Sequence, residues 1–136
     1  RIQGLGKTTP QQTYDEGWKL FDEKKYPEAR RIFEQLRNRP DSDPMKVTGT
    51  FFVGQTYLRE NNYAKAMEFF QEVVRLYPNS TWFLESRYHI GLCLERLGRI
   101  EEARQMYNSV IKQAPQNRWA GFSSERLQAL SRSSNK

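Results

Sequence analysis

Two short groups of residues combine types and spacings that could perform chemistry. Glu85, His89 and Cys93 follow one another at intervals of four residues, which would place three kinds of metal ligand on one face of a helix. Residues 4–8 read Gly-Leu-Gly-Lys-Thr and imitate the end of a phosphate-binding loop. Either group would need further partners in the chain to become a site.

The sequence does not supply those partners. One His and one Cys are too few soft ligands for zinc, and Cys93 stands among Ile90, Leu92 and Leu94, as a core cysteine does. The phosphate loop would need a glycine where Arg1 stands. A nucleophile with a dedicated base and orienting group cannot be assembled around a single His either. We therefore expect no enzyme, no metal site, no cofactor and no small-molecule substrate.

The excess of basic residues raises the question of a nucleic-acid partner, because the net charge is +6. A phosphate-binding face clusters Lys and Arg. Residues 10–46 instead hold eight basic and eight acidic residues, and the excess lies mainly in the last quarter and at the ends of the chain. This distribution disfavours nucleic acid. No apolar run approaches the ~20 residues of a bilayer span, so membrane contact is expected only through an anchor outside this segment.

Residue types recur along the chain at an interval of 37 positions. The recurring sets are Gly17, Gly54 and Gly91; Ala29, Ala66 and Ala103; Phe33, Phe70 and Tyr107; Tyr14, Phe51 and Tyr88; Pro78 and Pro115; and Trp82 and Trp119. Agreement of so many sets on one interval indicates a repeat protein. We divide the chain into a flexible lead (1–9), three repeats (10–46, 47–83 and 84–120), and a capping helix with a disordered tail beginning near Ser131 (121–136).

Each repeat is predicted to form two helices. In the second repeat Val47, Phe51, Gly54 and Leu58 follow helical spacing, and a second helical stripe starts at Ala66 after a polar break. Helix boundaries agree: Pro40, Pro78 and Pro115 close second helices, Asp43 and Ser80 can cap those that follow, and Gly98 suits a left-handed C-cap. The expected fold class is all-α, an α-solenoid of three helix hairpins plus a C-terminal capping helix.

These residues resemble the tetratricopeptide repeat (TPR) family, in which a small residue in the first helix precedes Tyr-x-x-Ala-x-x-x-Phe and a closing proline. The clearest repeat carries the pattern on Gly54, Tyr57, Tyr63, Ala66, Phe70, Val73 and Pro78, the next on Gly91, Leu94, Ile100, Ala103, Tyr107, Val110 and Pro115, and the first on Gly17, Leu20, Tyr26, Ala29, Phe33 and Leu36. Pro40 closes the first repeat one residue early. The resemblance covers residues 10–134 and implies stacked hairpins whose first helices line a concave surface.

The interval of 37 residues exceeds the family's usual period of about 34. Together with the phrase Leu76-Tyr77-Pro78-Asn79-Ser80, it resembles the subgroup of bacterial cell-envelope proteins. That subgroup includes the repeat lipoprotein of the outer-membrane β-barrel assembly machine and the repeat domain of the Tol-Pal-associated cell-division coordinator. The resemblance implies a periplasmic protein that binds other proteins within an envelope assembly.

The first helix of each repeat carries aromatic and arginine residues on the stripe that the resemblance places on the concave surface. We expect them to form a groove for a peptide or partner helix, since aromatic and Arg anchors dominate such interfaces. The expected contacts are Tyr14, Trp18, Asp22, Phe51, Gln55, Arg59, Tyr88, Leu92 and Arg96. The Asn and Lys of the family's carboxylate-clamp subclass are not matched, so chaperone C-terminal tails are not the expected ligand.

Two alternatives remain open. Tyr14, Phe51 and Tyr88 would serve equally well to pack adjacent helices, and Arg59 and Arg96 to end helices in solvent. The protein would then be a structural or oligomerising module that binds through its convex face or its helix edges. The other alternative is a weak nucleic-acid binder, whose affinity would fall steeply with salt.

Overall fold

A computed structural model describes residues 8–40 and 43–134, and the regular elements of these residues are seven α-helices without a strand. The helices are α1 (Pro10–Asp22), α2 (Tyr26–Arg37), α3 (Met45–Arg59), α4 (Tyr63–Leu76), α5 (Phe83–Arg96), α6 (Ile100–Gln113) and α7 (Arg118–Ser134). Each helix packs against the next one along the chain. The all-α solenoid of helix hairpins followed by a last helix is confirmed.

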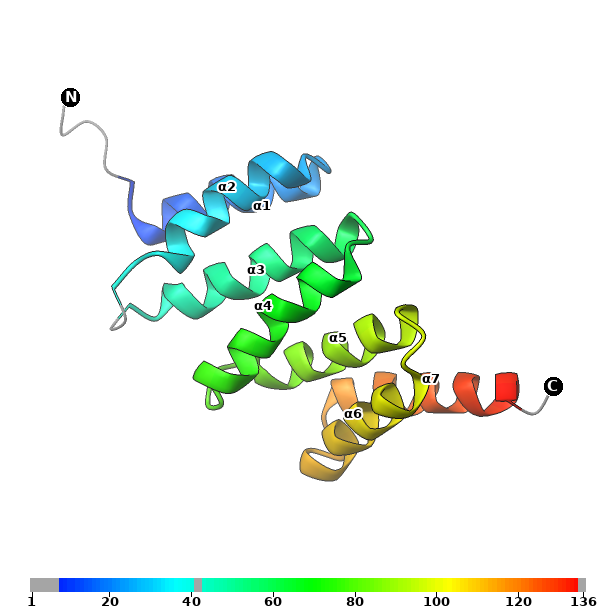
Figure 1. Cartoon of the computed structure of the whole chain (residues 1–136). Coiled ribbons are helices and arrows are strands. Elements are labelled where there is room, and N and C mark those ends of the chain that lie inside the picture. The colour runs from blue at the N-terminus through cyan, green and yellow to red at the C-terminus, as the bar shows by residue number, and fades with distance from the viewer. Residues whose placement is uncertain (1–7, 41–42, 135–136) are drawn as a thin grey trace.

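The helices lie in two layers. Figure 1 shows α2, α4 and α6 towards the viewer and the odd-numbered helices behind them. Within the odd layer, α1 contacts α3 and α5 contacts α7. Phe51 of α3 stacks on His89 of α5 with ring centroids 5.9 Å apart, so the odd-numbered helices form one continuous face, which we call the inner face, and the even-numbered helices form the outer face.

Local residue choices set the turns of the hairpins. Lys24, Asn61 and Gly98 have φ values of 64°, 62° and 81°, and they stand at the same position of successive repeats. The left-handed conformation expected for Gly98 thus recurs in all three hairpin turns. At the start of α1, the Thr9 hydroxyl accepts from the Gln12 N–H while the Gln12 side chain accepts from the Thr9 N–H, which is a capping box.

The chain ends differ in part from expectation. Residues 1–7 of the predicted flexible lead lie outside the described residues. The disordered tail predicted from Ser131 is wrong for residues 131–134, because α7 continues to Ser134. Leu130 is 8% exposed and Leu127 packs against the core, so their apolar contacts hold the last turns of the helix.

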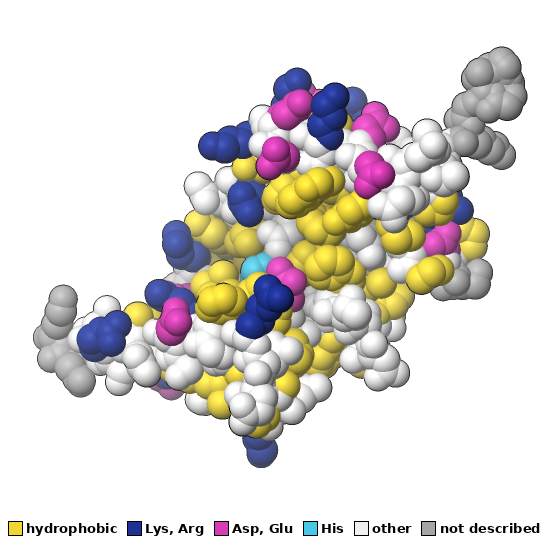
Figure 2. All heavy atoms as spheres, turned by 180° about the vertical axis from the view of Figure 1, so that it is seen from behind, with side chains coloured by type: hydrophobic (Ala, Val, Ile, Leu, Met, Phe, Trp, Pro, Cys, Tyr) yellow, Lys and Arg dark blue, Asp and Glu magenta, His cyan; other side chains and the backbone are white. Residues whose placement is uncertain are grey.

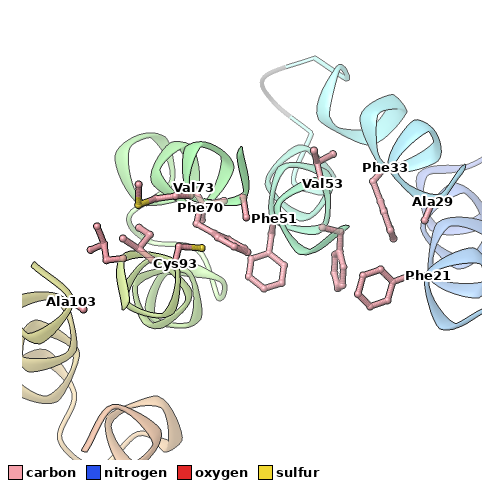
Figure 3. Packing of buried hydrophobic residues seen from close by; sticks show 14 of the residues in the cluster. Phe21, Ala29, Phe33, Phe51, Val53, Phe70, Val73, Cys93 and Ala103 are labelled. Atoms are coloured by element: carbon pink, nitrogen blue, oxygen red, sulfur yellow. The ribbon is translucent and has the colours of Figure 1, made fainter. Parts of the chain in front are cut away.

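The recurring glycines let a ring from the second helix of each hairpin reach the first helix. A Cβ on Gly17 would lie 2.7 Å from the Phe33 ring, and one on Gly54 would lie 2.9 Å from the Phe70 ring. No real Cβ contact is that short, so a larger residue would push the helices apart. Figure 3 shows Phe33 and Phe70 among the buried side chains of one continuous core.

A second set of small residues lies between neighbouring repeats. Gly49, Ser86 and Ser123 are each buried and recur at the same interval of 37 residues. A Cβ on Gly49 would lie 2.5 Å from the backbone nitrogen of Arg37, so α3 crosses α2 at backbone contact. These small residues share the interval of 37 residues but are not among the recurring sets that defined the repeats.

Candidate functional site

A pocket of about 190 Å³ opens on the inner face where α1, α3 and the start of α5 meet. We call it the aromatic pocket, and its lining comprises Trp18, Phe21, Phe51, Phe52, Gln55, Arg59, Trp82 and Glu85. Figure 2 shows hydrophobic side chains gathered over the middle of this side of the molecule, with Lys and Arg side chains along one edge. The site therefore combines an apolar surface with a basic border.

Trp18 is the exposed aromatic side chain of the pocket. Its ring stacks on Phe21 with centroids 5.3 Å apart and meets the edge of Phe52 at 5.9 Å. These contacts hold the indole in place, yet 45% of the residue remains exposed. A large, rigid aromatic side chain at the mouth of a pocket is typical of an interface anchor.

Phe51 lies at the bottom of the pocket rather than on its surface. It is only 1% exposed, and its ring stacks on Trp82 with centroids 4.4 Å apart. The Trp82 indole Nε1 in turn donates to the Thr48 hydroxyl at 3.1 Å. Phe51 was expected as a ligand contact, but its burial makes it a packing residue, in agreement with the alternative interpretation.

Two buried polar side chains near the bottom of the pocket have unused hydrogen-bonding capacity. Gln55 is 7% exposed, and no hydrogen bond from the rest of the described chain reaches its amide. His89 is 8% exposed; its Nε2 lies 3.5 Å from Glu85 Oε2, while its Nδ1 has no partner in the described part of the chain. An unsatisfied buried polar group is unfavourable by about 1–3 kcal/mol. The penalty applies to His89 Nδ1; the Gln55 amide is not fully buried and reaches the open space of the pocket, where a ligand can bond to it.

The two expected arginines lie over aromatic rings at the ends of α3 and α5. The Arg59 guanidinium lies 5.0 Å from the centre of the Phe21 ring, and that of Arg96 lies 5.7 Å from the centre of the Tyr63 ring. Arg96 also donates to the Tyr63 hydroxyl at 3.2 Å. Neither arginine has an ion-pair partner within residues 8–40 and 43–134. Their charge is therefore available to a ligand.

The remaining expected contacts are dispersed. Leu92 and Arg96 line a second pocket of about 200 Å³, together with Leu58, Asn61 and Tyr63. Tyr14 packs against Phe52 with centroids 5.6 Å apart, and Tyr88 packs against Trp119 at 5.3 Å. Burial raises the pKa of both phenol groups. Asp22 is exposed at the end of α1 and lines neither pocket.

The structure adds Phe21, Phe52, Trp82 and Glu85 to the aromatic pocket. Trp82 could have been found from the sequence, because Trp82 and Trp119 recur at an interval of 37 residues. In the structure Trp82 packs against Phe51, and Trp119 packs against Tyr88 at the equivalent position. No sequence feature pointed to Phe52, because it stands next to Phe51 and outside the predicted contact stripe. Glu85 was considered only as a metal ligand.

In α5, the spacing of Glu85, His89 and Cys93 reflects core packing, because Cys93 belongs to the buried hydrophobic cluster. Cys93 is fully buried, and burial raises the pKa of its thiol to about 12, so the thiolate needed by a metal is disfavoured. Within the described residues no three His, Cys, Asp or Glu side chains are grouped so that they could hold a metal ion.

Among the helices described, none has the length and apolar character to cross a membrane.

This architecture of stacked hairpins with one inner face is that of a TPR-like repeat protein, which the comparisons with known proteins bear out. Residues 22–110 match the family model of anaphase-promoting complex, cyclosome, subunit 3, and the chain belongs to that family. No curated protein sequence gives a significant match.

Solved structures share the fold at low sequence identity. The Yersinia enterocolitica type III secretion translocator chaperone SycD has a TM-score of 0.79 at 17% identity, with 97% of this chain and 98% of that chain covered. PcrH in complex with the chaperone binding region of PopB has a TM-score of 0.73 at 20% identity, with coverages of 91% and 98%. The first TPR of Spaghetti (RPAP3), bound to an HSP90 peptide, has a TM-score of 0.73 at 20% identity, with coverages of 93% and 94%.

Proposed function

We propose that this protein is a protein-interaction scaffold that binds a peptide or a helix of a partner protein on its inner face. One observation carries the proposal: Trp18, 45% exposed, stands in the same pocket as Gln55, a buried amide without a hydrogen bond from the described chain. The indole offers apolar contact area, and the amide can bond to a main-chain amide of the ligand. Such a combination supplies both affinity and orientation.

The similar structures support this use of the fold. PcrH was solved with a region of PopB, and the first TPR of Spaghetti was solved with an HSP90 peptide. In this chain, Arg59 lines the aromatic pocket and Arg96 lines the second pocket, and neither has a carboxylate partner in the part that the structure describes. We infer that the ligand places an apolar side chain in the aromatic pocket and an acidic residue near these arginines.

A peptide library displayed on phage tests the proposal without knowledge of the natural partner. Selected peptides should bind the wild-type protein, and Trp18→Ala should weaken binding about tenfold or more, as loss of an interface anchor does. Gln55→Ala should also weaken it, through the lost hydrogen bond. The matched control is Leu76→Ala, which removes a side chain that is 49% exposed at the end of α4. Peptides that bind Trp18→Ala as well as they bind the wild type would contradict the proposal.

We also propose that the scaffold acts in a bacterial envelope assembly, in the periplasm. The support is the repeat interval of 37 residues and the Leu76-Tyr77-Pro78-Asn79-Ser80 phrase, which resemble the envelope subgroup. Fractionation of cells that produce the full-length natural protein tests this localisation. Recovery of the protein with cytoplasmic markers would contradict it.

A further inference from the structure

The outer face contains a crevice between α2 and α4 that the chain's own side chains close. The Arg30 guanidinium lies 3.8 Å from the centre of the Tyr57 ring. The Arg37 guanidinium lies 5.0 Å from the centre of the Phe69 ring and donates twice to Glu72, at 3.3 and 3.0 Å. Arg30 also pairs with Glu60, so two arginines, two rings and two carboxylates lie together beside α3.

One repeat later the same positions carry different side chains. An interval of 37 residues leads from Arg30, Arg37, Tyr57, Phe69 and Glu72 to Met67, Val74, Leu94, Met106 and Ser109. The second set contains no charged and no aromatic side chain. It therefore cannot form an equivalent of the Arg37–Glu72 ion pair or of the contacts between arginines and aromatic rings. A pocket of about 270 Å³ opens there, over α5 and between α4 and α6. Figure 1 shows α5 between these two even-numbered helices.

The lining of this outer pocket mixes apolar side chains with polar ones, among them the Arg99–Glu102 ion pair, and it includes Arg87, which has unused donors. Ile90, Leu94 and Met106 supply apolar surface. Arg87 stands where the preceding repeat has Thr50; its Nη1 donates to Gln113 at 2.6 Å, but its Nε is buried and has no hydrogen-bond partner in the described part of the chain. The Arg87 Nη2 also lacks a hydrogen bond from the described chain and, unlike Nε, is not fully buried, so it is the donor that a carboxylate in the pocket can reach.

We propose that the outer pocket binds a segment of a partner polypeptide that inserts one large apolar side chain and pairs an adjacent carboxylate with Arg87. The volume of about 270 Å³ suits a single side chain, since sites for drug-sized molecules occupy roughly 300–1,000 Å³. The pocket lining carries Arg87 and Arg99 against Glu102, so its local charge is positive and favours an acidic residue of the partner. The pocket shares no residue with the aromatic pocket, so this inference stands independently of the function proposed above.

The methionines report on this pocket. The chain has three, of which Met106 lines the outer pocket and Met45 begins α3 in another repeat. With ¹³C-methyl-methionine labelling, titration with the dipeptide acetyl-Phe-Glu-amide should shift the Met106 resonance to saturation and leave Met45 unchanged. Acetyl-Phe-Gln-amide should bind about tenfold more weakly, because it lacks the charge-assisted bond. Arg87→Gln should abolish the difference between the two probes.

A closing variant gives an independent control. Val74→Arg combined with Ser109→Glu rebuilds the Arg37–Glu72 bridge one repeat later, and it should abolish the Met106 shift, whereas Trp18→Ala should not alter it. Circular dichroism checks that each variant is folded; if the double variant is not, Arg87→Gln decides alone. An unmoved Met106 resonance, or equal affinity of the wild type for the two probes, would overturn the proposal.

Discussion

The ring of Tyr107 lies so close to Gly91 that a Cβ on Gly91 would stand 2.5 Å from the ring's Cε1 atom. The Tyr107 hydroxyl donates to Glu95 at 2.9 Å, and Glu95 also pairs with Arg126 of α7. One ring from α6 thus sets the spacing to α5 and connects, through Glu95, to the last helix. The ring has little freedom to move aside.

Gly91→Ala should therefore lower the free energy of unfolding by about 1–3 kcal/mol through overpacking, even though alanine favours helix by about 1 kcal/mol. Gly121→Ala is the matched control, because a Cβ there has no neighbouring atom within 4 Å. This second variant should be neutral or stabilising. Urea unfolding measures both, and equal changes in the two variants would show that the ring tolerates the added methyl group.

Trp18 and Phe51 line the same pocket but should respond differently to truncation. Phe51→Ala removes a side chain that is 1% exposed, and it should lower the free energy of unfolding by about 3–5 kcal/mol. Trp18→Ala removes one that is 45% exposed, so it should cause a smaller loss of stability while it weakens peptide binding. Thermal unfolding and a binding titration on both variants check this. A Trp18 variant as unstable as the Phe51 variant would place the indole in the core.

The Glu95–Arg126 pair should govern how firmly α7 is attached. The hydrogen bond from Arg126 to Glu95 raises the pKa of the guanidinium, and Glu95 is mostly buried at 12% exposure of its side chain. Arg126→Ala should speed hydrogen exchange of α7 amides more than that of α1 amides, because it leaves a buried carboxylate short of a partner. Arg132→Ala, at an exposed position of the same helix, is the control. Uniform acceleration across all helices would instead indicate global destabilisation.

Alkaline pH should destabilise the fold through Cys93. Burial raises the pKa of this thiol from 9.0 to about 12, so above pH 9 the unfolded chain loses a proton that the folded chain retains. The free energy of unfolding should then fall as pH rises from about 9 to 12, by up to about 1.4 kcal/mol per pH unit for this group. Cys93→Ala should make that slope shallower by about this amount, measured by urea unfolding at several pH values. An unchanged slope would show that the thiol ionises equally in both states.

Much of the fold could be predicted because the information is local and repeated. Gly54 and Phe70 stand at fixed positions within a repeat, and the same pairing recurs as Gly17 with Phe33 and as Gly91 with Tyr107. Helical spacing needs only the side chains of one segment, so the hairpins follow from sequence. The close crossing at Gly49 was missed, because it depends on where α2 meets α3.

The candidate site was only partly predictable. Trp18 of α1 and Gln55 and Arg59 of α3 were identified from the same stripe of successive first helices, and the structure brings them into one pocket. Phe51 belongs to the same stripe but is covered by Trp82, which lies immediately before α5. Whether a stripe residue faces solvent depends on the side chains of neighbouring helices, and no spacing within one helix encodes that.

The sequence by itself determined the helices, their recurrence every 37 residues and the small residues that bring them together, since periodicity and backbone preferences act within a segment. Only the tertiary structure decided which aromatic side chains remain exposed and which crevices stay open. Those outcomes depend on side chains from three different helices meeting in space, as Gln71 of α4, Leu94 of α5 and Met106 of α6 do around the outer pocket.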